Sequence, residues 1–288
     1  MIALHIQAPF AVFRNFTAGW YRPTASFLTP SAAYGLILNL AGLESRRDDG
    51  QSIMTLTAFD LPSAQIAIGA DPDNPHGPFP ATQSMFQQLH NYPVGSSGKE
   101  RKEDTKGNKY NITPVRREFL ASFRAYILLK SSPDLESRVR QGILGTLETS
   151  RYGLPFLGDN AFLIDKIKVI DDAPILAHWY TRIGPDDESE IRPHTTRLTC
   201  WVDRAEMSKT QVGLFAPTIE AIPIESMPQS AWTLIDPPPQ PAQAEPSKPK
   251  KAAKPKSIPK PLESQAESFE LRTNPNMKTT QKGLFDDD

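Results

Sequence analysis

The sequence predicts an α+β fold in which a ferredoxin-like domain comes first. Up to residue 170 the hydrophobic patterns follow the order strand, helix, strand, strand, helix, strand, which is the order of that fold. A long polar insertion separates the middle elements, and a smaller β-rich region is expected at residues 171–235. From residue 236 onward proline, lysine, alanine and serine leave too little apolar surface for a core, so residues 236–288 are expected to be disordered.

The first strand and the first helix have the strongest patterns. Residues 2–7 alternate apolar and polar side chains, as in a half-buried strand. Residues 29–43 are expected to form a helix that begins at Thr29, because its hydroxyl can accept from a free amide of the first turn. Gly42 is expected to end this helix in the left-handed conformation, and Gly35 inside it indicates a close approach by another backbone or by a ligand. One face of the helix is apolar and should be buried: Ala33, Leu36, Ile37, Leu40 and Leu43.

The remaining elements of the first 170 residues follow from periodicity and turn residues. A second helix is expected at residues 134–149, a short helix at 83–90 and a turn at 46–51. Two segments flanking the polar insertion, 91–94 and 110–115, are expected to pair as a long hairpin with residues 95–109 at its tip. Further strands are expected at residues 53–59, 64–70, 116–130 and 161–170.

Bulk composition excludes several classes of site. The net charge is −1, so any surface that binds nucleic acid must be local. The single cysteine, Cys200, excludes an intramolecular disulfide and a cysteine-rich zinc site. The N-terminal residues lack the basic start and apolar core of a signal peptide, and no apolar run reaches the length of a membrane span. We therefore expect a soluble, cytoplasmic protein with no membrane partner, no cofactor and no bound metal.

Residues 85–130 form a locally basic segment. They contain nine lysines and arginines against four acidic residues, a local charge of about +5, and aromatic residues are interleaved with them. Cations neutralise phosphates and aromatic rings stack on bases, so the combination is typical of single-stranded RNA binding. The alternative is a solvated loop. Arg116 and Arg117 are better candidates than Lys99, Arg101 and Lys102, because the start of a strand fixes them in space.

Two other segments carry candidate binding residues. A loop between the first strand and the first helix holds Arg14, Asn15, Trp20, Tyr21 and Arg22. Its alternative interpretation is a surface loop with incidental charge. The segment YGLPFLGDN, residues 152–160, contains two glycines that permit a backbone approach to phosphate, although no Walker sequence follows it.

The signals for catalysis are weak. The five histidines show no metal-ligand spacing, and no GxSxG motif is present. RNA can be cleaved without metal by a general acid and base, and His90 with Tyr92 beside the basic segment is one such pair. A noncatalytic role is the favoured interpretation.

The segment from Phe13 to Gly42, with its FR-x-F start and the sequence TPSAAYGLILNLAG, resembles the N-terminal signature of the Cas-five family. These are the RAMP subunits of type I CRISPR interference complexes, and the DevS-like branch is the most similar. The likeness extends more loosely over residues 1–235. It implies an RRM-type RAMP domain over residues 1–170 with a basic β-hairpin thumb inserted at about 85–118, then a β-rich domain and a tail.

The resemblance also implies a function and a set of contacts. A Cas-five subunit binds the 5′ handle of the CRISPR RNA (crRNA) and caps the Cascade surveillance complex, beside a Cas-seven backbone subunit and the large subunit, and meets target DNA through that complex. Phosphate contacts would come from Arg14, Arg22, Arg116 and Arg117. Tyr21 would stack on a base or pack beneath the RNA, and Trp20 would belong to the core or to a subunit interface. The loop containing Gly158 resembles the "LG" loop of the family. The alternatives are a metal-independent endoribonuclease that processes precursor crRNA, and a purely structural scaffold.

Overall fold

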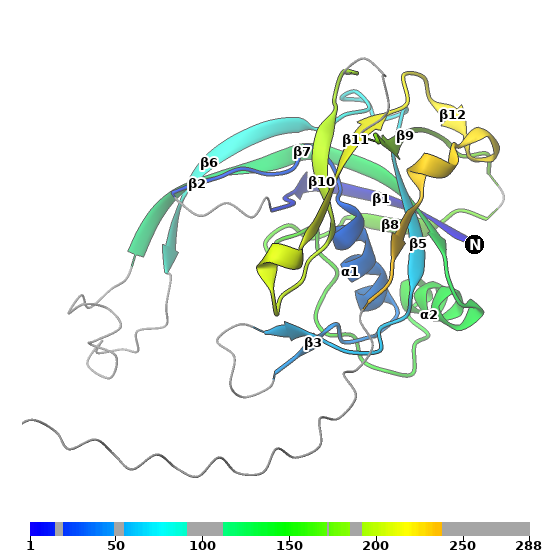
Figure 1. Cartoon of the computed structure of the whole chain (residues 1–288), viewed down its shortest axis with the longest axis horizontal. Helices are drawn as coiled ribbons and strands as arrows, with labels where there is room; N and C mark the ends of the chain where they lie inside the picture. The colour runs from blue at the N-terminus through cyan, green and yellow to red at the C-terminus, as the bar shows by residue number, and fades with distance from the viewer. Residues whose placement is uncertain (15–19, 49–54, 91–111, 172, 185–191, 238–288) are drawn as a thin grey trace, which may run out of the picture. The chain divides into compact units, whose positions relative to one another are not determined.

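The computed structural model describes residues 1–14, 20–48, 55–90, 112–171, 173–184 and 192–237 (Figure 1). The chain divides into two compact units, residues 1–241 and residues 242–288. The second unit lies outside the described residues. Of the segment predicted to be disordered, 236–288, everything from residue 238 onward lies outside them as well. The fold of the first unit is α+β, as the sequence predicts.

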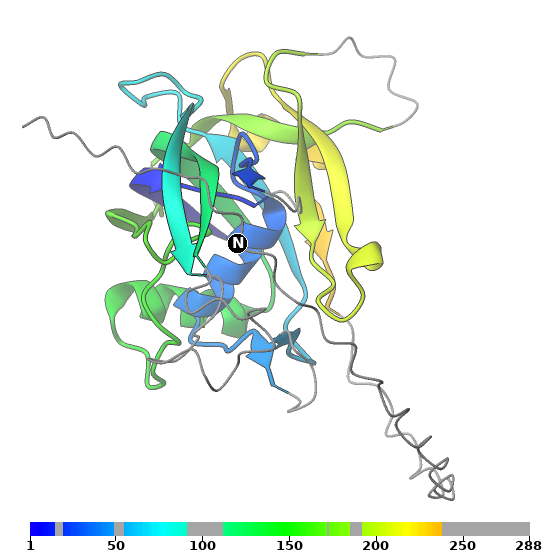
Figure 2. The ribbon, with the colours of Figure 1, turned by 90° about the vertical axis from the view of Figure 1, so that its left-hand side faces the viewer.

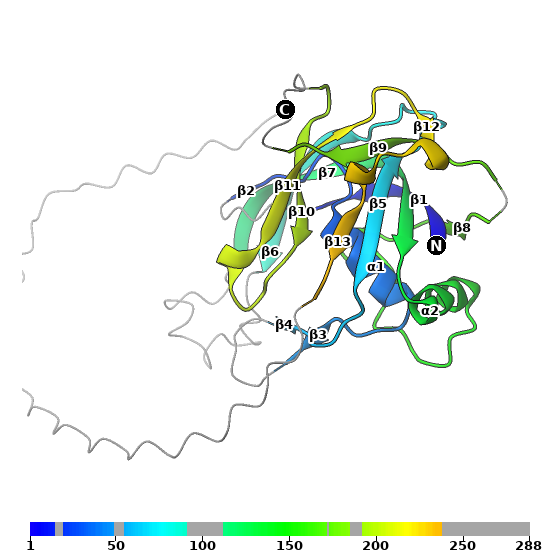
Figure 3. The ribbon, with the colours of Figure 1, turned by 45° about the vertical axis from the view of Figure 1, so that its right-hand side comes forward.

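Four antiparallel strands form the centre of the sheet. They are β1 (Ile2–Ala11), β5 (Ala64–Ala70), β7 (Ile112–Lys130) and β8 (Lys166–Val169), and their spatial order is β5-β7-β1-β8. The helices α1 (Pro30–Leu40) and α2 (Pro133–Leu144) pack on one face (Figure 3). The main core lies between them and the sheet, and includes Leu4, Ile6, Ile37 and Leu135. Alternate residues of β1 are therefore buried because they face the helices.

Strands from the C-terminal half extend the same sheet beyond β5. The order continues as β5-β9-β11-β10, with β9 (Leu176–Arg182), β10 (Thr196–Trp201) and β11 (Gln211–Pro217). Two short strands pair with parts of interior strands: β12 (Ile222–Pro223) pairs with β9, and β13 (Thr233–Ile235) pairs with β5. Three single-turn helices connect these strands: η1 (Met207–Lys209), η2 (Ile224–Ser226) and η3 (Gln229–Ala231). A second, smaller core around Trp179 fills the sheet face opposite α1 and α2.

A long hairpin projects from the sheet (Figures 1 and 2). Its strands are β6 (Ala81–His90) and the first half of β7, paired from Ala81↔Ala121 to His90↔Ile112. The helix expected at residues 83–90 is thus wrong, because ladder hydrogen bonds to β7 satisfy this backbone as a strand. The connecting residues 91–111 lie outside the described part of the chain. On the other side of β7, the two-residue strand β2 (Tyr21–Arg22) runs parallel to it.

The ends of the helices follow the predicted capping chemistry. The Thr29 hydroxyl accepts from the Ala32 amide at 3.1 Å, and Gly42 adopts φ +67°, as expected. The approach by another backbone that was one alternative at Gly35 is wrong: the residue is exposed, and a Cβ placed there would meet no protein atom within 4 Å. Ser132 caps α2, whose end at Leu144 comes before the predicted residue 149, because Gly145 takes a left-handed conformation.

The remaining small sheet corrects one local prediction. Strand β3 (Arg46–Arg47) pairs with β4 (Leu56–Thr57), where the sequence predicted a turn from residue 46. Of the strand predicted at 53–59, residues 53 and 54 lie outside the described part of the chain. Within the described residues, no helix has the length and apolar character needed to cross a membrane.

Candidate functional site

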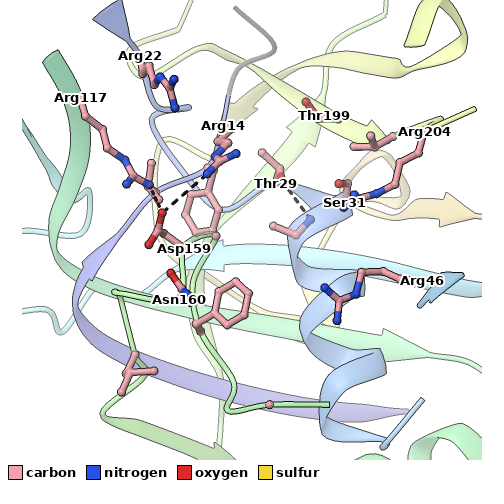
Figure 4. A pocket seen from close by; sticks show the side chains of 18 of the residues that line it. Arg14, Arg22, Thr29, Ser31, Arg46, Arg117, Asp159, Asn160, Thr199 and Arg204 are labelled. Carbon is pink, nitrogen blue, oxygen red and sulfur yellow. Dashed lines mark hydrogen bonds and ion pairs between the residues drawn. The ribbon is translucent and has the colours of Figure 1, made fainter. Parts of the chain in front are cut away.

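An open pocket of about 1230 Å³ lies at the N-terminal end of α1 (Figure 4). Segments far apart in the sequence form its walls: the end of β1 and β2, the start of α1, β3, β7, the loop at residues 152–163, and β10 with the loop that follows it. Thr29 and Ser31 at the start of α1 line it, so the positive end of the helix dipole is directed toward this space.

Arginine dominates the charge of the pocket lining. Five arginines line it against a single carboxylate, that of Asp159, as Figure 4 shows. An excess of guanidinium groups over carboxylates creates a positive potential, and guanidinium matches the geometry of phosphate. The pocket is therefore suited to a polyanion. The five are Arg14, Arg22, Arg46, Arg117 and Arg204.

Asp159 is the centre of a small charge network on one wall. Its Oδ2 lies 2.6 Å from Arg117 Nη2 and 3.9 Å from Arg14 Nη2. Burial opposes ionisation of this carboxyl group, but the amide of Ala161 and the two guanidinium groups outweigh it and lower the pKa of Asp159. The side chain of Arg117 is only 9% exposed, whereas that of Arg14 is 67% exposed. Arg117 thus neutralises Asp159, and Arg14 remains accessible to an anion.

A second wall brings two guanidinium groups together. Arg46 lies over the ring of Tyr152, with its Cζ 3.5 Å from the ring centroid, and its Nε donates to Glu44 at 3.1 Å. Partial burial and the nearby charge of Arg46 lower the pKa of Arg204. A bound anion would lessen the repulsion between these two positive groups.

Gly158 has a packing role in this wall. It adopts φ +78°, and a Cβ there would lie 1.6 Å from the carbonyl oxygen of Val12. The Val12 amide also donates to the Leu157 carbonyl at 3.1 Å. The glycine therefore lets the loop join the end of β1, which places the next residue, Asp159, beside Arg117. This packing against Val12 is enough to explain a glycine at position 158, and the predicted approach of its backbone to phosphate stays a prediction.

Two predicted residues lie on the opposite side of the hairpin from the pocket. Tyr21 pairs with Arg116 and Arg22 pairs with Arg117. Successive residues of a strand face opposite sides, so Arg22 and Arg117 line the pocket while Tyr21 and Arg116 face away from it. The structure therefore brings these two predicted segments side by side and divides their residues between two surfaces.

Glu118 holds Tyr21, which faces away from the pocket, in place. The Tyr21 hydroxyl donates to Glu118, which raises the pKa of this phenol, and the Thr24 amide donates to the same carboxylate at 3.1 Å. The neighbouring Trp20 was predicted to belong to the core or to a subunit interface; it is 64% exposed, so the core alternative is wrong and the interface alternative stays a prediction. No sequence signal distinguished Glu118 from any other acidic residue of the basic segment.

Several predicted residues cannot be placed. Asn15, Lys99, Arg101, Lys102 and Tyr92 lie outside the described residues, as does the side chain of His90. Among the residues that are described, no group of three or more histidine, cysteine or acidic side chains is arranged to hold a metal ion. Sequence reasoning missed Arg46, Asp159 and Arg204, because each joins the pocket from a segment distant in the chain.

Comparison with known proteins identifies one matching family. The family model described as CRISPR-associated protein (Cas_Cas5) matches residues 1–163. No curated protein matches the chain. A solved structure titled "CRISPR RNA-guided surveillance complex" is 13% identical with a TM-score of 0.48, and the match covers 78% of this chain and 91% of that chain. Another, titled "Crystal structure of Cas protein", is 11% identical with a TM-score of 0.37, covering 79% of this chain and 97% of that one.

Proposed function

The chain belongs to the Cas-five family of CRISPR-associated proteins (Cas_Cas5), and on that premise we propose that it is a noncatalytic RNA-binding subunit. It holds the 5′ handle of a crRNA and caps one end of a Cascade surveillance complex in the cytoplasm. The matched residues 1–163 contain β1, α1, β5, β6, β7 and α2 together with most of the pocket lining. In the complex the subunit adjoins the Cas-seven backbone subunit and the large subunit, and meets target DNA through them.

We propose that the central sheet is a ferredoxin-like RAMP platform and that the β6–β7 hairpin is its thumb. The antiparallel order β5-β7-β1-β8, with both helices on one face, supports the platform. The length and projection of the hairpin support the thumb (Figure 1). The β-rich residues 171–235 are proposed to act as a smaller domain beside this platform.

The observation that carries the proposal is the arginine excess of the pocket. Arg14, Arg22, Arg46 and Arg204 neutralise successive phosphates of a single strand, while Arg117 is held by Asp159 and fixes the wall between them. Exposed rings on the loop at residues 152–163, those of Tyr152 and Phe156, face unpaired bases. RNA is recognised in this way, by shape and by splayed bases.

The test is an equilibrium titration of labelled 5′-handle RNA by fluorescence anisotropy, repeated over a series of salt concentrations. Each phosphate contact to a single strand contributes about −0.7 to the log–log slope. Arg22→Gln and Arg204→Gln should each weaken binding and flatten the slope by about 0.7. Arg140→Gln is the control, because Arg140 lies on α2, outside the pocket lining, and pairs with Asp171.

Two outcomes contradict the proposal. A slope near zero, or pocket variants that bind like the control, would favour the scaffold alternative. RNA recovered from the titration is also run on a denaturing gel after incubation in EDTA. Intact RNA is expected, and a single cut position would make the protein a metal-independent endoribonuclease.

A further inference from the structure

Three side chains from three strands form one row on the outer side of the hairpin. Phe86 of β6 and Tyr21 of β2 both pair with Arg116 of β7, so the guanidinium lies in register between two aromatic rings. Phe86 is 78% exposed and Tyr21 is 39% exposed, and Trp20 adds a third exposed ring 6.2 Å from Tyr21. We call this set, Trp20, Tyr21, Phe86 and Arg116, the outer row.

Two members of the outer row, Tyr21 and Arg116, are held in place by hydrogen bonds. Arg116 Nη2 donates to Ser84 Oγ at 3.2 Å, and its Cζ lies 5.9 Å from the centroid of the Tyr21 ring. The Tyr21 hydroxyl donates to Glu118. That carboxylate also accepts from the Thr24 amide at 3.1 Å, so protein donors already engage the negative charge nearest the row. The Tyr21 ring is thus preorganised, with the guanidinium group of Arg116 beside it.

The outer row is separate from the arginine pocket. Its residues alternate along β2 and β7 with Arg22 and Arg117, which line the pocket, and no member of the row lines it. An RNA strand held by the pocket arginines therefore leaves the outer row unoccupied.

We propose that the outer row is a second binding site for single-stranded nucleic acid, distinct from the pocket that binds the handle. Unpaired bases stack on the exposed rings, and Arg116 contacts the phosphate between them. Every base has a π-face, so such a site accepts many sequences. The site stands on its own geometry and does not depend on handle binding in the pocket.

The surroundings of the row favour nucleic acid over a protein partner. Polar side chains lie next to the row on this face of the hairpin, Thr82 and Ser84 on β6 and Glu118 on β7, while the apolar residues of the same face are Pro114 and the buried Leu120. The core of a protein interface is apolar and depleted of charge. Isolated rings among polar groups, with one guanidinium between them, instead match a stacking surface.

The experiment uses the full chain saturated with unlabelled 5′-handle RNA. A fluorescein-labelled, unstructured 12-nucleotide DNA of mixed sequence is then titrated in, and its anisotropy is measured. Phe86→Ala and Trp20→Ala should each weaken DNA binding about tenfold, since a base–aromatic stack contributes about 1–3 kcal/mol. Phe86→Trp keeps an aromatic ring and should bind the DNA as the wild-type chain does. Leu144→Ala is the matched control, because Leu144 is 70% exposed and lies on α2, outside the row and the pocket lining.

Crossing these variants with the pocket variants separates this proposal from the proposed function. Arg22→Gln should weaken handle RNA and leave DNA binding unchanged, whereas Phe86→Ala should do the reverse. Equal loss of both ligands in both variants means a single continuous site and overturns the inference. DNA binding that is unaffected by Phe86→Ala also overturns it. A third result would also overturn it: the wild-type chain binds no DNA, and Phe86→Ala loses a protein subunit that copurifies with the wild type. The row would then be a protein interface.

Discussion

The Asp159–Arg117 ion pair should be the most sensitive point of the pocket wall. Asp159→Asn removes the negative charge but keeps the shape of the side chain. The side chains of Asp159 and Arg117 are 13% and 9% exposed, and their closest N–O distance is 2.6 Å. After the substitution Arg117 would remain buried without a counter-ion among the described residues, where its other hydrogen bond goes to Gln87 at 3.3 Å.

Removing one partner of a buried ion pair costs about 3–5 kcal/mol. The asparagine amide oxygen can still accept one hydrogen bond from Arg117, so we expect the lower end, about 3 kcal/mol. The control is Asp171→Asn. It breaks the pair with Arg140, whose N–O distance is similar at 2.7 Å but whose side chains are 42% and 51% exposed. Solvent screens exposed pairs and they contribute little to stability, so this variant should be nearly as stable as the wild type.

Urea unfolding followed by circular dichroism measures both variants, and a pH series tests the electrostatic origin. The pKa of Asp159 is lowered in the folded protein. The pair therefore contributes its full stability above the ordinary aspartate pKa of about 3.9, and this is lost as the pH falls through the lower, folded-state pKa. The difference between wild type and Asp159→Asn should be constant near neutral pH and shrink in acid. If Asp159→Asn costs no more than Asp171→Asn, or if the difference persists in acid, the buried-pair argument is refuted.

Four further substitutions test other parts of the structure by their urea midpoints. Gly153→Ala should cost about 1–2 kcal/mol from its φ of +71° alone, because nothing lies within 4 Å of the new Cβ. Gly158→Ala should cost at least about 2 kcal/mol more, since its Cβ would overlap the Val12 carbonyl, and equal losses would contradict the packing role. Gly35→Ala should stabilise the protein by about 1 kcal/mol, because the site is helical and open; a loss would reveal a contact there. Thr29→Ala should cost about 1 kcal/mol through loss of the cap, and no change would mean that solvent replaces it.

Features set by neighbouring residues were predictable from the sequence. The cap at Thr29, the left-handed Gly42 and the alternation of β1 each depend on a few adjacent side chains and their backbone. The wrong helix at residues 83–90 shows the limit of local patterns. Its strand conformation depends on hydrogen bonds to β7, about 30 residues later in the chain, and no local pattern in that segment reports such a partner.

The pocket was only half predictable for the same reason. Arg14 and Arg22 are close in sequence to a predicted helix start, so their position near a site could be inferred. Arg46 begins β3 and Arg204 lies in the loop after β10, and the two join the same pocket only in the folded chain. Their residue type does not indicate that they share a pocket, because an arginine outside the core is usually solvated.

The two-residue period of strands limits what a cluster of charges in the sequence can mean. Tyr21, Arg22, Arg116 and Arg117 look like one patch, but their registers divide them between two faces. The charge of Arg117 is also neutralised by Asp159, so it should not add a phosphate contact. The four other arginines of the pocket therefore set an upper limit of about −3 on the salt slope for handle RNA. A steeper slope, unchanged in Arg116→Gln, would mean that further cations join the site and that the described pocket is only part of it. A slope that falls in Arg116→Gln would mean that one strand runs across both faces.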